Sequence, residues 1–151
     1  MTTWRERVEV ARRENRPQHL VTGVPYAAFA GIAADLDDSG HPRCRLRYAD
    51  ALIGNPLIPA LHGGVIGGLL ESAAIILLLW ESEPGVVPVT VNMSFDFLRT
   101  GRPVDVLATG RVYKQGRRVA NVRVEAWQDD RERPIAAAHG HFLLKREGQD
   151  G

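Results

Sequence analysis

The stretch Gly54–Trp80, GNPLIPALHGGVIGGLLESAAIILLLW, decides how this chain folds. Pro56 and Pro59 exclude a helix before Ala60, because proline lacks an amide hydrogen and restricts the residue before it. From Leu61 to Trp80 the apolar residues fall on every side of a helical wheel. This pattern predicts one long helix that is enclosed on all sides, in a protein core or in a bilayer.

One charged residue, Glu71, stands in the middle of this apolar run. A carboxylate at the centre of a bilayer would cost about 2–3 kcal/mol. Alternating strands typical of a soluble protein follow the run, so we expect a core helix and no membrane contact. A carboxylate inside such a helix is expensive unless it is hydrogen-bonded, neutral or used in chemistry. Glu71 is therefore a candidate catalytic acid, and the alternative is a structural acid bonded to backbone.

Length and composition limit what the protein can be. With 151 residues, of which 44% are hydrophobic and 25% charged, we expect one domain over residues 1–151 with its own core. The net charge of +1 gives no signature of nucleic-acid binding. The single cysteine, Cys44, excludes an intrachain disulfide framework and a cysteine metal cluster. The N-terminus is charged and lacks the apolar core of a secretion signal, so we expect a cytoplasmic protein.

The rest of the chain divides into one helix and six strands. Before the central stretch we expect a helix capped by Thr2 or Thr3 and ended by Pro17 (residues 1–16), a connector or short strand (19–26), and a hairpin of two strands (29–37 and 43–48). After it we expect strands at 87–97, 104–114, 117–128 and 135–145, and a frayed tail at 147–151.

The strand at 87–97 has the clearest alternation in the chain. One face holds six apolar side chains: Val87, Val89, Val91, Met93, Phe95 and Phe97. Such alternation predicts a sheet with one apolar face, and short turns between the later strands make them antiparallel. We therefore expect an α+β fold in which an antiparallel sheet of about six strands curls round the central helix. Pairing of sheet edges across a two-fold axis would protect an exposed edge.

The motif His62-Gly63-Gly64, with Glu71 nine residues after the histidine, resembles the hotdog-fold acyl-CoA thioesterases, in particular the phenylacetate-pathway (PaaI-like) and thioesterase superfamily member two type. The segments VTVNMSFDFLRTG and KQGRRVANVRVE support this resemblance, which covers about residues 29–145. It implies a hotdog fold and hydrolysis of an acyl- or aryl-CoA to the free acid and coenzyme A. It also implies a homodimer or homotetramer with active sites between subunits, and no metal or redox cofactor beyond the coenzyme A of the substrate.

The resemblance also implies roles for single residues. Glu71 matches the acid that acts as general base or nucleophile, and Gly63 matches the glycine whose N–H binds the thioester carbonyl. Thr90 lies where relatives carry a hydroxyl that helps to place water. Relatives carry an amide six residues before the histidine, but here that position is Pro56 and the nearest amide is Asn55.

Several further residues are candidates for binding substrate. A helix N-terminus presents free N–H groups, so Gly63 and Gly64 offer a site for an oxyanion, although they could also serve only close packing. Gly64, Gly67 and Gly68 leave a narrow clear face beside Glu71 where an acyl chain could lie. His62 could bond a substrate group or cap the helix. The other candidates are Asn92 for substrate and two neighbouring basic turns for coenzyme A phosphates: Arg99, Arg102, Arg117 and Arg118. Solvated hairpin ends are the alternative interpretation of these turns.

Two readings compete with the thioesterase. The letters GNPLIP loosely match the Gly-x-Pro-x-x-Pro of hotdog hydroxyacyl dehydratases, but those enzymes place a catalytic histidine where this chain has Ala51. A non-catalytic acyl-CoA-binding protein is the other alternative. His139 and His141 share one face of the last strand, and without a nearby carboxylate or cysteine they do not predict a metal site.

Overall fold

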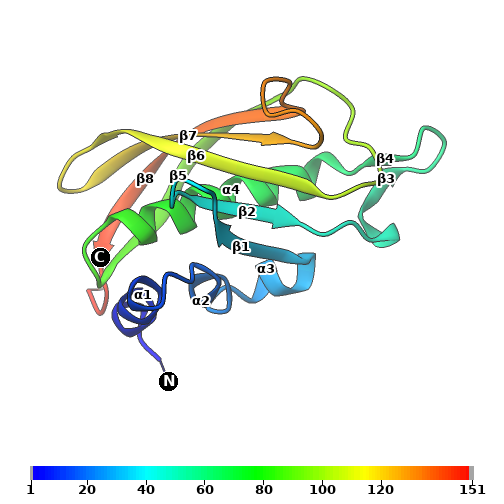
Figure 1. Ribbon diagram of the computed structural model, residues 1–151. Helices are drawn as coiled ribbons and strands as arrows, with labels where there is room; N and C mark the ends of the chain where they lie inside the picture. Colours follow the sequence, from blue (N-terminus) through cyan, green and yellow to red (C-terminus); the bar gives the residue numbers. More distant parts are fainter. Residues whose placement is uncertain (1, 150–151) are drawn as a thin grey trace.

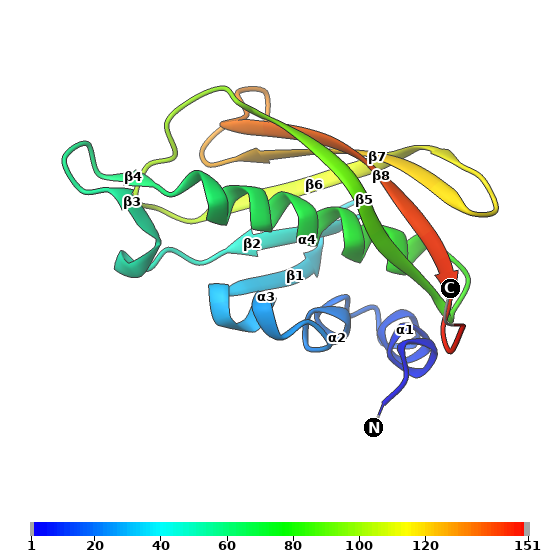
Figure 2. The same cartoon turned by 180° about the vertical axis from the view of Figure 1, so that it is seen from behind.

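In the computed structural model, which describes residues 2–149, a six-stranded antiparallel sheet curls round the helix α4 (Gly63–Glu81). The predicted α+β architecture is confirmed (Figures 1 and 2). The sheet strands are β1 (Ile32–Leu36), β2 (Pro42–Leu46), β5 (Val86–Phe97), β6 (Val106–Gln115), β7 (Val119–Trp127) and β8 (Ala136–Arg146). The remaining elements are the helices α1 (Trp4–Arg13), α2 (Gln18–Val21) and α3 (Pro25–Ala30), a 3-10 turn (Asp50–Leu52), and a small hairpin of β3 (Ile53–Asn55) and β4 (Ala60–Leu61).

The helix α4 is the core of the molecule. Ten of its apolar residues are buried, among them Leu69, Leu70 and Leu78, which have no exposed surface. By length and composition alone α4 could cross a bilayer, but here strands and helices of the same chain cover its apolar side chains. The helices α1–α3 lie in a row beside β1, on the other side of α4 from β7 and β8 (Figure 1).

The order of strands in the sheet is β1-β2-β6-β7-β8-β5. The predicted short-turn connection along the last four strands is correct only for β6, β7 and β8. The strand β5 pairs with β8, from Val86↔Arg146 to Phe97↔Ala136, and not with β6, which follows it in sequence. The segment after β5 therefore crosses the sheet. This leaves β5 at one edge, with one side unpaired.

The prediction that six apolar side chains of β5 share one face is wrong for its first half. The register with β8 shifts between Thr90 and Asn92, so Val91 is an extra residue in a β-bulge. Thr90 lies opposite the fully buried Phe142 and faces the core, whereas Val89 is 42% and Val91 61% exposed. After the bulge the inward face passes to Met93, Phe95 and Phe97. One inserted residue reverses the faces because the side-chain period of a strand is two.

The N-terminal region holds more helix than the sequence predicted. Thr3 and Glu6 form a capping box at the start of α1, which confirms the cap. Residues 19–26, expected as a connector or strand, belong largely to α2 and α3, and Phe29 lies in α3 and not in the first strand. The tail from Glu147 is not frayed as far as Gln149: the Glu147 carboxylate accepts hydrogen bonds from the Trp4 and Arg5 N–H groups at 2.7 and 3.1 Å. Residues 150 and 151 lie outside the described part.

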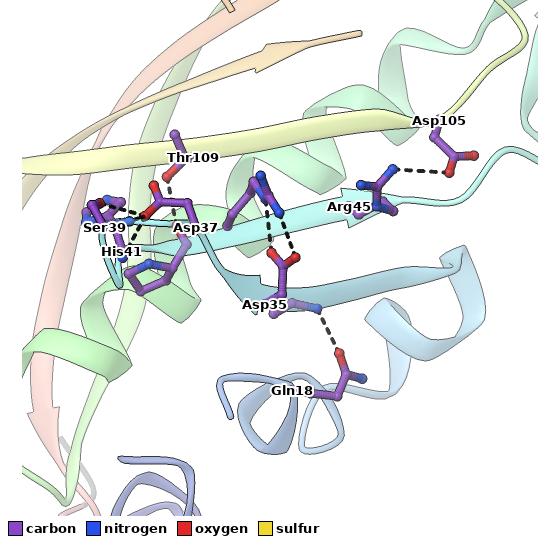
Figure 3. Close-up of polar contacts among 11 residues, drawn as sticks. Gln18, Asp35, Asp37, Ser39, His41, Arg45, Asp105 and Thr109 are labelled. Atoms are coloured by element: carbon purple, nitrogen blue, oxygen red, sulfur yellow. Dashed lines mark hydrogen bonds and ion pairs between the residues drawn. The ribbon is translucent and has the colours of Figure 1, made fainter. Parts of the chain in front are cut away.

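Polar contacts fix the hairpin of β1 and β2 (Figure 3). Arg43 makes a bidentate pair with Asp35 at 3.0 and 2.8 Å. The Ala34 N–H donates to the side-chain oxygen of Gln18 at 2.7 Å, which ties the hairpin to α2. In the turn, hydrogen bonds from the Ser39 hydroxyl and the His41 N–H lower the pKa of Asp37 to about 2. The hairpin and its turn are therefore as predicted.

Candidate active site

The residue before α4 caps the N-terminus of this helix. His62 is the N-cap, and its Nδ1 accepts the Gly64 N–H at 2.8 Å. The small β3–β4 hairpin fixes the His62 backbone, whose N–H donates to the Leu52 carbonyl at 2.9 Å. A Cβ atom on Gly54 would lie 2.7 Å from the His62 Cα, so only glycine lets β3 approach so closely. Of the two roles predicted for His62, the structure therefore shows the cap.

The cap leaves one N–H group at the helix start free. The Val65 N–H donates to the His62 carbonyl at 3.1 Å, and the Gly64 N–H is taken by the imidazole. The Gly63 N–H forms no hydrogen bond to any acceptor within residues 2–149. This free N–H lies at the positive end of the helix dipole, which is suited to stabilise an oxyanion. The Gly64 N–H, the second predicted donor, is already occupied.

A hollow of about 460 Å³ runs along α4 from this end. Four glycines and one acid from α4 line it, together with two aromatic rings of β5: Gly63, Gly64, Gly67, Gly68, Glu71, Phe95 and Phe97. The Phe95 and Phe97 rings stack at 6.4 Å between centroids and stand over Gly67 and Gly63. The predicted clear face beside Glu71 therefore exists, and an apolar group could lie in it.

Glu71 is half-buried in the wall of this hollow. Within residues 2–149 its carboxylate accepts no hydrogen bond and forms no ion pair. The alternative of a structural acid bonded to backbone therefore has no support in the contacts of this chain. A half-buried carboxylate with free lone pairs can accept a proton from water or attack a carbonyl carbon.

One geometric limit follows from helix dimensions. Glu71 is eight residues after Gly63, which is about 12 Å along the helix axis. A thioester carbonyl bound to the Gly63 N–H must lie within about 3 Å of the atom or water that attacks it. This separation along the backbone disfavours direct action of the Gly63 N–H and the Glu71 carboxylate of one chain on the same carbonyl.

The predicted adjacency of the two basic turns is wrong within one chain. Arg99 borders a second hollow of about 400 Å³ that shares Gly63 and Phe97 with the first, so it lies near the helix start. Arg102 pairs with Asp129 at the same end. Arg117 and Arg118 border a groove of about 1080 Å³ with Ser82, beyond the other end of α4. The full length of β6 separates the two turns, and the strand predicted at 104–114 already implied this separation.

Three other predicted residues do not line the glycine hollow. Thr90 faces the core opposite Phe142, further along β5. Asn92 lies opposite the exposed His141 on the outer face of the sheet, and its side-chain oxygen bonds the His141 Nδ1 at 2.8 Å. Asn55 is exposed in the small hairpin, where its side-chain oxygen accepts the Leu57 N–H at 3.1 Å. Within residues 2–149 no three histidine, cysteine or acidic residues are arranged to hold a metal ion.

Tyr26 of α3 is a neighbour of the site that the sequence did not indicate. Its hydroxyl end packs against Gly68, where a Cβ atom would lie 2.8 Å from the hydroxyl oxygen. The reason for the omission is that α3 itself was not predicted. A signal was present: Pro25 at the first helical position and Gly31 after the last, with φ of +80°, mark the two ends of a helix.

Comparison with known proteins agrees with this fold. A family model described as the thioesterase superfamily matches residues 59–135. The chain is 41% identical to a protein of Chromobacterium violaceum whose structure has a TM-score of 0.75, with 93% of this chain and 97% of that chain covered. A phenylacetic acid degradation-related protein of Ralstonia eutropha is 25% identical, with a TM-score of 0.71 and coverage of 85% and 98%. The medium/long-chain acyl-CoA thioesterase YigI of Salmonella typhimurium is 23% identical, with coverage of 83% and 88%.

Proposed function

Because this chain belongs to the thioesterase superfamily and has its hotdog fold, we propose that it hydrolyses acyl-CoA thioesters, with Glu71 as general base or nucleophile. The observation that carries the proposal is the hollow in which a free helix-terminal N–H and an unpaired carboxylate are joined by a stripe of glycines. The name of the Salmonella relative makes medium- and long-chain acyl-CoA the first substrates to test.

In the proposed reaction the thioester carbonyl oxygen accepts the Gly63 N–H. Water, activated by a glutamate, or the glutamate itself attacks the carbonyl carbon, and the negative charge that develops on the oxygen is stabilised at the helix N-terminus. Collapse of the tetrahedral intermediate breaks the carbon–sulfur bond. Where the glutamate acts as a base, the proton that it took from water passes to the sulfur, so the products are the free acid and the thiol of coenzyme A. Where the glutamate is the nucleophile, the thiolate takes a proton from solvent, and a water molecule then hydrolyses the acyl-glutamate anhydride to the free acid. The proposed chemistry uses side chains and backbone of this protein, and coenzyme A enters only as part of the substrate.

A second copy of the chain would complete the site. Because Gly63 and Glu71 of one α4 are separated by about 12 Å along the helix axis, an antiparallel α4 from another copy would place the partner subunit's Glu71 nearer to a carbonyl bound at Gly63. The unpaired edge of β5 and the exposed Val89 and Val91 beside it offer a surface for such a copy. We therefore propose a homodimer, or a tetramer built from two such dimers, with shared active sites.

The proposed dimer also determines which arginines can reach the phosphates of coenzyme A. Arg99 is close to Gly63 through the adjoining hollow, so it can meet a phosphate of a coenzyme A whose thioester lies at the helix start. Arg117 and Arg118 are at the far end of their own chain and could reach that molecule only from the partner subunit. Their assignment to phosphate binding therefore depends on the dimer.

The substitution Glu71→Gln tests the chemistry directly. It keeps the shape of the side chain and removes its basicity, so we expect kcat to fall at least about 100-fold, the usual scale for loss of a base. Binding of intact acyl-CoA and the melting temperature should stay close to those of the parent protein. Release of free thiol from acyl-CoA measures kcat, and calorimetry measures acyl-CoA binding and the melting temperature.

The matched control is Glu81→Gln, the same substitution at an exposed position at the end of the same helix. It should leave kcat unchanged. A Glu71→Gln protein that is stable and turns over at nearly the parent rate would overturn the proposed role of Glu71. A variant that loses stability while the folded fraction keeps its turnover would identify Glu71 as a structural acid.

Mixing two inactive variants tests whether the sites are shared. Glu71→Gln chains lack the carboxylate. Gly63→Pro chains lack the backbone N–H, and proline is tolerated at this first helical position. Each variant therefore lacks one half of every site in its own homodimer. In a mixed dimer, one of the two shared sites has an intact Gly63 from one chain and an intact Glu71 from the other. Random exchange should therefore restore about a quarter of the parent activity. No recovery after verified exchange would show that each site is contained in one chain.

A further inference from the structure

Aromatic rings approach the glycine stripe from two elements, the strand β5 and the helix α3. Phe95 and Phe97 of β5 line the glycine hollow directly. The helix α3, which lies beside β1, also contacts α4 (Figure 2). From α3, the Tyr26 ring reaches Gly68, one of the glycines of the stripe.

The contact between Tyr26 and Gly68 is close and specific. A Cβ atom on Gly68 would lie 2.8 Å from the Tyr26 hydroxyl oxygen and 3.0 Å from its Cε1, so only glycine at this position allows the ring to rest on the helix. Tyr26 is nevertheless 47% exposed. A large aromatic ring that leans on the helix while half of its surface stays open can still bury apolar area against a ligand.

The position of the ring relative to the chemistry limits what it can touch. Gly68 precedes Glu71 by three residues, so the two lie on one face of α4, about 5–6 Å apart between Cβ positions. Tyr26 therefore stands beside the stripe within one helical turn of the acid. Phe29, one turn further along α3, packs its ring at 6.4 Å from that of Tyr26 but is 88% exposed, and no contact joins it to the stripe.

We propose that Tyr26 is a specificity-determining residue that contacts the acyl chain of the substrate, as a wall of the acyl slot in addition to Phe95 and Phe97. This inference rests on the proposed function, because it assumes that an acyl group lies along the glycines. The contact is made by the ring rather than by the hydroxyl. The class of ligand is a linear acyl chain long enough to extend from the thioester past Gly68.

The test separates the acyl contact from catalysis by measuring binding without hydrolysis. Non-hydrolysable S-butyl- and S-octyl-CoA thioethers are titrated into the parent protein and into the variants Tyr26→Ala and Tyr26→Phe. Each methylene that becomes buried should tighten binding about fourfold. We expect the gain from butyl to octyl to shrink at least about tenfold in Tyr26→Ala and to be kept in Tyr26→Phe, whereas S-butyl-CoA binds all three proteins alike.

Two further variants make the test specific. Phe29→Ala removes an aromatic ring from the same helix without touching the stripe, and it should leave the butyl-to-octyl gain unchanged. Gly68→Ala should reduce the gain because the new methyl group displaces the Tyr26 ring, and it should have a smaller effect in the Tyr26→Ala background, where no ring remains to be displaced. Melting temperatures establish that each variant is folded.

The outcomes divide cleanly. An unchanged gain in folded Tyr26→Ala overturns the proposal, as does a Tyr26→Phe protein that loses the gain, which would assign the effect to the hydroxyl. Loss of the gain in Phe29→Ala would place the contact on α3 as a whole and also contradict it. Failure of the proposed function is a different result: the parent protein would bind the thioethers but release no thiol from octanoyl-CoA.

Discussion

The two halves of the helix α4 differ in how much of their surface is open to a ligand. The first half, Gly63–Gly68, has four glycines, an open hollow and an N–H without an acceptor in residues 2–149. The second half ends in Ile76–Leu79, where no side chain has more than 1% of its surface exposed. A single helix thus supplies both a ligand-accessible surface and the densest part of the core.

The two ends are also closed differently. At the start, His62 takes only the Gly64 N–H and leaves Gly63 available. At the end, Arg12 of α1 donates from Nη2 to the carbonyls of Leu79, at 3.3 Å, and Ser82. A cation is favourable at a helix C-terminus, so the guanidinium satisfies both the carbonyls and the helix dipole. We therefore expect the two ends to contribute differently to stability, and the predictions below compare them.

The largest expected effect is a loss of stability at the closed end. Leu78→Ala removes a side chain with no exposed surface and leaves a cavity, so the free energy of unfolding should fall by about 2–5 kcal/mol. Because Leu78 is far from the hollow, the folded fraction should keep its kcat. Urea unfolding together with thiol release measures both quantities. A loss below about 1 kcal/mol would show that the core is less tightly packed here than its burial implies.

Substitutions at the two ends of α4, at Arg12 and His62, should have smaller effects on stability than Leu78→Ala. Arg12→Ala leaves two carbonyls unpaired beside the buried end of α4 and should cost about 1–3 kcal/mol, whereas Arg12→Lys should recover part of the loss. His62→Ala removes a cap that is exposed, where water can replace it, and should cost about 0.5–2 kcal/mol. Only His62→Ala should change kcat, because it frees a second N–H beside Gly63. Equal effects of both variants on kcat would refute the separation of the two ends.

The sequence predicted the buried second half of α4 better than its glycine-rich first half. The apolar run with no polar side fixes α4 and the sheet that must enclose it, because burial is a property of composition and period. Glu71 and the glycines are visible for the same reason: each interrupts an otherwise uniform pattern. The hollow they line could be inferred, but its walls could not, since these come from strands and helices that are distant in sequence.

The errors have specific physical causes. The bulge at Val91 is invisible to a period-two reading, because valines before it and phenylalanines after it are all apolar. Arg99 and Arg117 are far apart because the strand β6 runs between their turns, so the turns lie at opposite ends of that strand. The short helices α2 and α3 gain their stability from packing rather than from propensity, so only the terminal Pro25 and Gly31 marked one of them.

The smallest expected effect on stability is that of Gly67→Ala, and its direction is informative. Gly67→Ala places a methyl group in the middle of the stripe, where its Cβ would lie 3.5 Å from the Phe95 ring, an ordinary contact. Because alanine is better than glycine in a helix interior by about 0.5–1 kcal/mol, the variant should unfold at the same or a higher urea concentration. The methyl group narrows the hollow, so kcat/KM for octanoyl-CoA should nevertheless fall about tenfold. The variant should thus gain stability and lose activity, the reverse of Leu78→Ala.

Sedimentation of the Gly67→Ala protein distinguishes the two surfaces that could meet this glycine. If the parent and the variant have the same oligomeric state, the loss of kcat/KM belongs to the ligand. If the methyl group instead lowers both stability and the fraction of oligomer, the stripe is kept clear for close packing of a second helix rather than for an acyl chain. A glycine retained at a cost in helix propensity is then explained by assembly alone, and the acyl slot lined by Tyr26 and Phe95 would have to be abandoned.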